Sequence, residues 1–175
     1  MIRKFIVAII LLVVAAHVWY SLPKKIEKVY NGVEFQLGSD NEEKVTIYLK
    51  GKLTKSLFGE KIFRGTLQIN DEIIPSGLAY EDTIEVVFGK VWVGGIIQYL
   101  EHTDDGLGQI YSYGIIYVNE DFTELTIAKN EQSGNGNSEW NGENGRMISA
   151  PASNRVEALA ISNRLLKDIF QIELE

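Results

Sequence analysis

The chain has 175 residues, of which 45% are hydrophobic and 23% charged, and its formal net charge is −7. This composition is typical of a folded globular protein and excludes a disordered tail. Residues 24–175 carry 15 basic and 24 acidic residues, so this part repels a phosphate backbone and no nucleic-acid partner is expected.

The first predicted element is an apolar segment at residues 5–22. As a helix it would be about 27 Å long at about 1.5 Å per residue, close to the ~30 Å hydrocarbon core of a bilayer. Trp19 and Tyr20 near its end, followed by Lys24 and Lys25, form the aromatic and basic pair that anchors a spanning helix at the headgroups.

Residues 1–23 are therefore predicted to form a membrane anchor, and the alternative is a cleaved signal peptide. The small residues Val14, Ala15 and Ala16 offer a cleavage site, but the apolar run continues to Tyr20, which favours an uncleaved anchor. A short tail before a single span normally stays inside the cell. We expect a single-pass protein of the cell membrane, with lipid as a partner and its carboxyl-terminal domain outside the cytoplasm.

A short linker at residues 24–31 and a first strand at 32–37 are predicted next. Residues 44–54 alternate between apolar and polar, and residues 63–70 do the same after a turn. Alternation of period two is typical of a strand with one buried face. These two segments are predicted to form an antiparallel hairpin.

Residues 44–64 hold a group of cations with Glu60 as the one acidic residue among them. The cations are Lys44, Lys50, Lys52, Lys55, Lys61 and Arg64. Close to the anchor, they either face anionic lipid headgroups or form a solvated strand face. The sequence leaves both interpretations open.

Further strands are predicted at residues 83–88, 91–100, 109–118 and 122–128. Gly94 and Gly95 predict a bulge or bend within the second of these. With residues 32–37 the count is about seven, which indicates an α+β, mainly β fold: an antiparallel meander sheet or a partly closed barrel, in a single domain over residues 32–175.

Residues 130–146 are predicted to form a long mobile loop whose one large apolar residue is Trp140. A helix is predicted at 154–170, because Asn154 and Glu157 form a capping box at its start. Its apolar half, which should pack on the sheet, consists of Ala158, Leu159, Ile161, Leu165, Leu166, Ile169 and Phe170.

No catalytic residue, metal ligand or cofactor is predicted. His102 is the one histidine after the anchor and the chain has no cysteine, which excludes the common nucleophile triads. The acidic turns lack the ligand spacing of a calcium loop. The carboxylates Glu101, Asp104 and Asp105 remain as the candidate groups of a hydrolase.

Tyrosines supply the one residue set with binding potential. Strict alternation places Tyr111, Tyr113 and Tyr117 on one face of the strand at 109–118. Tyrosines suit sugars, peptides or lipid-like ligands, and the alternative is that they pack in the core. Together with Trp140, which either closes over this face as a lid or pins its own loop, they are the predicted ligand-binding residues.

Two segments resemble uncharacterised small membrane-anchored proteins of Gram-positive bacteria. The segments are Leu57-Phe58 with Phe63-Arg64-Gly65-Thr66-Leu67, and Ser149-Ala150-Pro151-Ala152-Ser153-Asn154-Arg155. The resemblance implies a bacterial, extracytoplasmic domain and carries no catalytic residues.

The sequence thus predicts a membrane-anchored, noncatalytic binding or interaction module. One alternative is a lipocalin-like small-ligand carrier, since a closed meander with a terminal helix is similar to that architecture, although the Gly-x-Trp expected near the first strand is absent. The other alternative is an extracytoplasmic hydrolase that depends on carboxylates.

Overall fold

The predicted anchor is described only in small part. The computed structural model describes residues 6, 9–12, 22–56, 59–89, 94–104, 106–132, 138–170 and 173–175. Residues 9–12 are helical. Within the described ranges no helix is long and apolar enough to cross a membrane. Most of the predicted anchor lies outside these ranges, so it stays a prediction.

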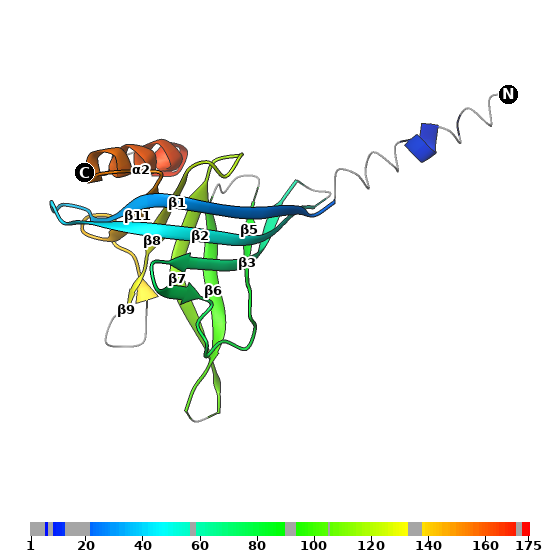
Figure 1. The fold of residues 1–175 in the computed structure, drawn as a ribbon, viewed down its shortest axis with the longest axis horizontal. Helices are drawn as coiled ribbons and strands as arrows, with labels where there is room; N and C mark the ends of the chain where they lie inside the picture. The colour runs from blue at the N-terminus through cyan, green and yellow to red at the C-terminus, as the bar shows by residue number, and fades with distance from the viewer. Residues whose placement is uncertain are drawn as a thin grey trace.

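A curled antiparallel sheet, shaped like half a barrel, makes up most of the domain (Figure 1). Eight strands follow in the order β4 (Glu72–Ile74), β3 (Lys61–Ile69), β2 (Glu42–Lys55), β1 (Lys24–Gln36), β11 (Arg146–Ala150), β8 (Leu125–Lys129), β7 (Gly108–Val118) and β6 (Gly94–His102). A ninth strand, β5 (Ile84–Phe88), pairs with β3 on the same side as β4. The short strands β9 (Glu131–Gln132) and β10 (Ser138–Glu139) pair separately, and α2 (Arg155–Phe170) ends the domain. The predicted mainly β fold with a terminal helix is confirmed.

Strand β1 begins at Lys24, so the predicted linker at residues 24–31 is wrong. Ile26 and Tyr30 in this segment are buried, and the segment pairs with β2 along its whole length. The long strand β2 supplies the backbone pairing that makes this segment a strand. The composition of residues 24–31 alone did not indicate it.

Strand β11 was not predicted, and it changes the topology. It pairs with β1 on one side and with β8 on the other, so the first and last strands of the chain are neighbours. The sheet is therefore not a simple meander. The strand has only five residues and four of them are buried, which leaves no alternation to detect.

The inner face of the curl is filled by apolar side chains. They include Ile47, Leu49, Phe63, Leu67, Ile84, Ile97, Ile116, Phe122, Leu125, Ile127 and Ile148. The cavity among the inner side chains is about 10 Å³, which is at the lower limit of the roughly 10–15 Å³ that one water needs. Among the described side chains the interior has no room for a small ligand.

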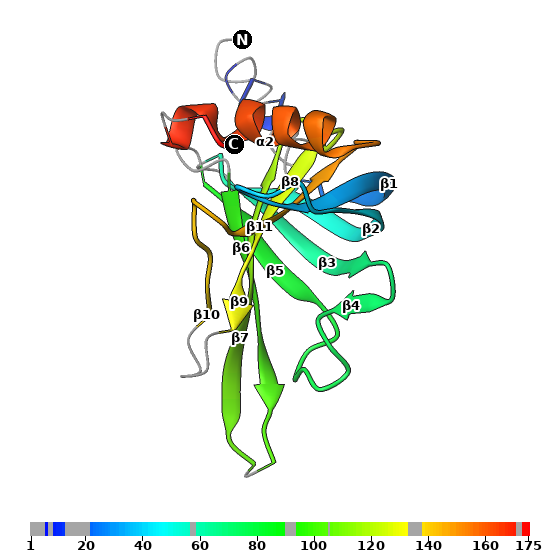
Figure 2. The ribbon, with the colours of Figure 1, turned by 90° about the vertical axis from the view of Figure 1, so that its left-hand side faces the viewer.

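Helix α2 lies across the outer face of the sheet (Figure 2). The predicted cap is present: Asn154 Oδ1 accepts a hydrogen bond from the Glu157 amide at 3.0 Å. The Glu157 carboxylate reaches back to the amide of Ser153 at 2.8 Å and to its hydroxyl at 2.7 Å. The buried outer cluster between helix and sheet contains Val33, Phe35, Leu37, Tyr117, Ala128, Met147, Ala158, Ile161 and Leu166. The predicted apolar face is confirmed, except at Phe170, whose side chain lies outside the described part.

Three buried hydroxyls lie between the helix and the sheet. Thr126 of β8, Ser149 of β11 and Ser162 of α2 are fully buried, and their oxygens are 2.7 to 2.9 Å apart. Each hydroxyl can donate to one neighbour and accept from the other, so the ring satisfies all three groups. The ring fixes the position of α2 on the sheet.

Candidate functional site

The three tyrosines of β7 do not share one face, so that prediction is wrong. Tyr113 belongs to the inner cluster and Tyr111 packs against it. Tyr117 is buried in the outer cluster under α2. No continuous tyrosine platform therefore exists on this strand.

A β-bulge reverses the alternation. The partner of β6 in β7 moves by two residues between Ile97 and Gln98, which leaves Tyr113 as the extra residue. Gly114 beside it has a φ of 153°, and a Cβ there would lie 2.2 Å from the carbonyl oxygen of Ala128. Only glycine therefore fits this position. Because of the bulge, odd-numbered residues up to Tyr113 lie on one face of β7 and those after it lie on the other.

Gly94 and Gly95, where the sequence predicts a bulge, pair in register with β7. Their role is close packing. A Cβ at Gly94 would lie 2.5 Å from the ring of Tyr117, and one at Gly95 would lie 2.2 Å from Cγ1 of Val86 in β5. Gly95 therefore lets β5 and β6 approach each other at one end of the curl.

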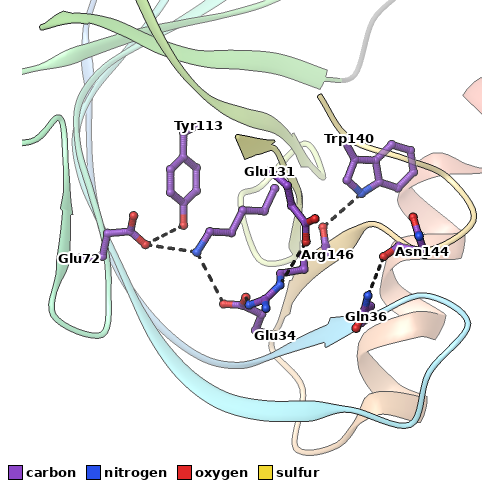
Figure 3. Close-up of polar contacts among 9 residues, drawn as sticks. Glu34, Gln36, Glu72, Tyr113, Glu131, Trp140, Asn144 and Arg146 are labelled. Carbon is purple, nitrogen blue, oxygen red and sulfur yellow. Dashed lines mark hydrogen bonds and ion pairs between the residues drawn. The ribbon is translucent and has the colours of Figure 1, made fainter. Parts of the chain in front are cut away.

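Tyr113 joins a chain of charged side chains at one end of the inner face (Figure 3). Its hydroxyl donates to Glu72 Oε2 at 3.2 Å. Lys129 Nζ lies 3.3 Å from the same oxygen, 3.9 Å from Glu34 Oε2 and 5.2 Å from the Tyr113 ring centre. Burial and the nearby carboxylates raise the pKa of Tyr113 well above its usual range. This tyrosine stays neutral and cannot act as a base.

Arg146 continues this ionic chain toward β9. Its guanidinium lies 3.2 Å from Glu34 and 3.3 Å from Glu131. The side chains of Glu34 and Lys129 are only 15% and 23% exposed, and both have partners of opposite charge. A series of ion pairs of this kind, with its central residues largely buried, links the strands to one another. Each charge already has a partner, so none is left free for a ligand.

Trp140 pins the segment that carries it. Its indole Nε1 donates to the Arg146 carbonyl at 3.2 Å, and the ring packs against the outer cluster. This geometry agrees with the pin interpretation. Part of the predicted loop at 130–146 forms the β9–β10 pair, and residues 133–137 lie outside the described part, so the predicted mobility stays untested.

A larger groove lies at the seam where β5 meets β6. We call it the seam groove; its volume is about 540 Å³ and its lining is Tyr80, Glu81, Thr83, Glu85, Val87, Gln98, Tyr99, Leu100 and Ile110. Leu100 is 43% and Ile110 67% exposed, although both are apolar. The volume falls within the roughly 300–1,000 Å³ of ligand sites.

One backbone edge of β6 faces the seam groove. Tyr80 N donates to Leu100 O and His102 N donates to Leu78 O, both at 2.9 Å. The backbone groups of alternate residues in a strand point to the same side, so those of Gln98 point toward the groove. Within the described ranges, no backbone hydrogen bond joins Gln98 to β5. The strand edge is open there.

Of the three carboxylates considered for a hydrolase, Glu101 and Asp104 lie within the described residues. Glu101 Oε1 accepts a hydrogen bond from Ser76 Oγ at 2.5 Å. Asp104 is exposed in the turn after β6, and Asp105 lies outside the described residues. In the part of the chain that the structure describes, no group of three histidine, aspartate or glutamate side chains is placed to hold a metal ion.

Alkaline titration should report on two tyrosines, one buried and one partly buried. Burial raises the pKa of Tyr30 and of Tyr99 to about 12, from the ordinary value of about 10. The folded state therefore keeps protons that the unfolded state loses, so their contribution to stability is complete below about pH 10 and is lost as the pH rises through about 12. Tyrosinate absorbance should show two groups that ionise near pH 12 in the folded protein and near 10 in denaturant. Ionisation of every tyrosine near 10 in the folded protein would contradict this.

Comparison with protein-family models, with curated proteins and with solved structures finds no match to this chain.

Proposed function

We propose that the chain is a membrane-attached, noncatalytic binding module that takes an extended peptide segment into the seam groove. The observation that carries the proposal is the open edge of β6 at Gln98 beside a groove of about 540 Å³. An extended peptide adds to an exposed sheet edge through main-chain hydrogen bonds, and pockets beside the edge select its side chains. The apolar segment at residues 5–22 supports the membrane attachment.

The groove also indicates which peptide side chains fit. Leu100 and Ile110 offer exposed apolar surface on its wall, which favours an apolar residue in the peptide. Glu81 lines the groove and is exposed, while Glu85 is paired with Arg64 at 2.5 Å. The Glu81 carboxylate favours a basic residue next to the apolar one.

Neither alternative function is favoured by a specific observation. A small-ligand carrier needs an internal cavity, and the inner core leaves about 10 Å³. A hydrolase needs paired carboxylates in a cleft, and Glu101 is hydrogen-bonded to Ser76.

The test is selection of peptides from a displayed random library on the immobilised full chain, followed by affinity measurement on variants. Leu100→Asp and Ile110→Asp place a charge on the groove wall and should weaken the selected peptides by roughly tenfold or more. Val156→Asp is the matched control, because Val156 is 76% exposed on α2 and the chemical change is similar.

The proposal is supported if both groove variants lose affinity while Val156→Asp binds like the unmodified chain. It is contradicted if the selected peptides bind the groove variants and the unmodified chain equally well. Failure to enrich any peptide with an apolar residue beside a basic one would contradict it as well.

A further inference from the structure

A row of cations crosses the outer face of three strands near the start of β1. Lys25 of β1 is directly opposite Lys52 of β2, and Lys52 is directly opposite Arg64 of β3. Adjacent strands lie only about 4.8 Å apart, and like charges in directly opposite positions destabilise a sheet. With Lys50 on the same face of β2, these residues form what we call the basic face.

The basic face is only partly neutralised within the protein. Lys25 pairs with Glu27, and Arg64 pairs with Glu85. Lys50 is directly opposite Glu27, but neither Lys50 nor Lys52 has an ion pair within the described ranges. Since residues 24–175 contain 15 basic and 24 acidic residues, this face has the opposite sign to the domain as a whole.

The basic face is also close to the apolar segment along the chain. Lys25 follows Leu22, the last residue of that segment, by three positions. Three residues span at most about 11 Å when fully extended, which is about one Debye length at ~0.1 M salt. Wherever the end of the apolar segment meets the membrane surface, Lys25 is held within reach of the headgroups.

We propose that the basic face docks on anionic lipid headgroups and fixes the orientation of the sheet at the membrane. The inference rests on the membrane attachment proposed above. Headgroup anions attract juxtamembrane cations and would relieve the repulsion between Lys25, Lys52 and Arg64. The alternative is that the same cations form a solvated strand face without lipid. Solvation alone gives no reason to place three cations in directly opposite positions.

The test uses the full chain in lipid nanodiscs, either of phosphatidylcholine alone or of phosphatidylcholine mixed with phosphatidylglycerol. Because the chain has no cysteine, a single introduced cysteine carries a unique spin label. Thr66→Cys places the label opposite Lys50 on the basic face, and Val156→Cys places the control label on α2. The measurement is the accessibility of each label to a water-soluble relaxation agent.

The label at position 66 should be protected in the anionic nanodiscs and exposed in the neutral ones, while the label at position 156 should be exposed in both. Combining Lys50→Gln with Lys52→Gln should lower the ratio of domains docked on the membrane to undocked domains by roughly 30-fold. This is the effect expected when the headgroup attraction of two cations is lost. Combining Lys44→Gln, at the other end of β2 opposite Val33, with Lys167→Gln on α2 removes the same charge outside the basic face and should leave the ratio unchanged.

The outcomes separate the two proposals. If the chain stays in the nanodiscs but position 66 is equally accessible in both lipids, the docking is wrong and the membrane attachment stands. If the chain does not stay in the nanodiscs, the attachment is wrong and the docking falls with it. Equal effects of the two double variants would also overturn the docking, because the attraction would then depend on net charge alone.

Discussion

Leu166→Ala is expected to lower the free energy of unfolding by about 2–5 kcal/mol, the range for truncating a buried leucine. Leu166 is 2% exposed and lies in the outer cluster between α2 and the sheet. The cavity left by the substitution would lie in the layer that the hydroxyl ring of Ser162 also stabilises. Denaturant titration of the variant against the unmodified chain measures the loss.

The control for this prediction is the neighbouring position. Lys167→Ala, on the exposed side of the same helix, should change the free energy of unfolding by less than about 0.5 kcal/mol. Both substitutions introduce alanine, so helix propensity hardly separates them. Similar losses at the two positions would mean that α2 does not pack as the structure has it.

Gly114→Ala is expected to destabilise the protein by about 2–4 kcal/mol, because two costs combine. The φ of 153° is sparsely populated by residues with a side chain, and the new Cβ would overlap the Ala128 carbonyl oxygen, 2.2 Å away. Removing the bulge by sliding β7 would turn the inner Tyr113 outward, so the protein cannot easily relax the strain.

Gly106→Ala separates these two costs. Gly106 has a φ of 77° and nothing within 4 Å of a Cβ, so alanine there should cost only about 1 kcal/mol through its backbone conformation. Thermal unfolding of both variants under the same conditions compares them. If Gly114→Ala cost no more than Gly106→Ala, the bulge would not be as tightly packed as described.

Regular alternation made much of the sheet predictable. Residues 44–54 and 63–70 correspond closely to β2 and β3, which pair as the predicted hairpin. The capping residues Asn154 and Glu157 marked the start of α2. In each of these elements the local pattern and the tertiary environment agree, which is the condition under which sequence reasoning succeeds.

The features missed by the sequence depend on contacts between distant segments. The bulge at Tyr113 adds one residue to a strand that otherwise alternates regularly in the sequence, and it moved Tyr117 to the other face. The ionic chain joins Glu34, Glu72 and Lys129, which are far apart in the sequence. Gly114 was the available signal, since a glycine inside a strand often marks a bulge.

The seam groove is a further feature that only the fold reveals. Its walls come from β5, from β6, from Ile110 of β7 and from the segment around Tyr80. Its open edge begins at Gln98, beyond the last hydrogen bond between Tyr80 and β6. The sequence placed the binding residues on β7 and at Trp140 instead. Aromatic content drew attention to buried tyrosines, whereas the accessible apolar surface is carried mainly by aliphatic residues such as Leu100 and Ile110.

The most direct test of peptide addition at the seam groove is amide hydrogen exchange of the full chain with and without a library-selected peptide. We expect the Gln98 amide to exchange markedly more slowly with the peptide bound, because it would then donate to the added strand, and the Gln36 amide at the far hollow beside Arg146 to be unaffected. Unchanged exchange at Gln98, or protection at Gln36 instead, would contradict the proposed binding site.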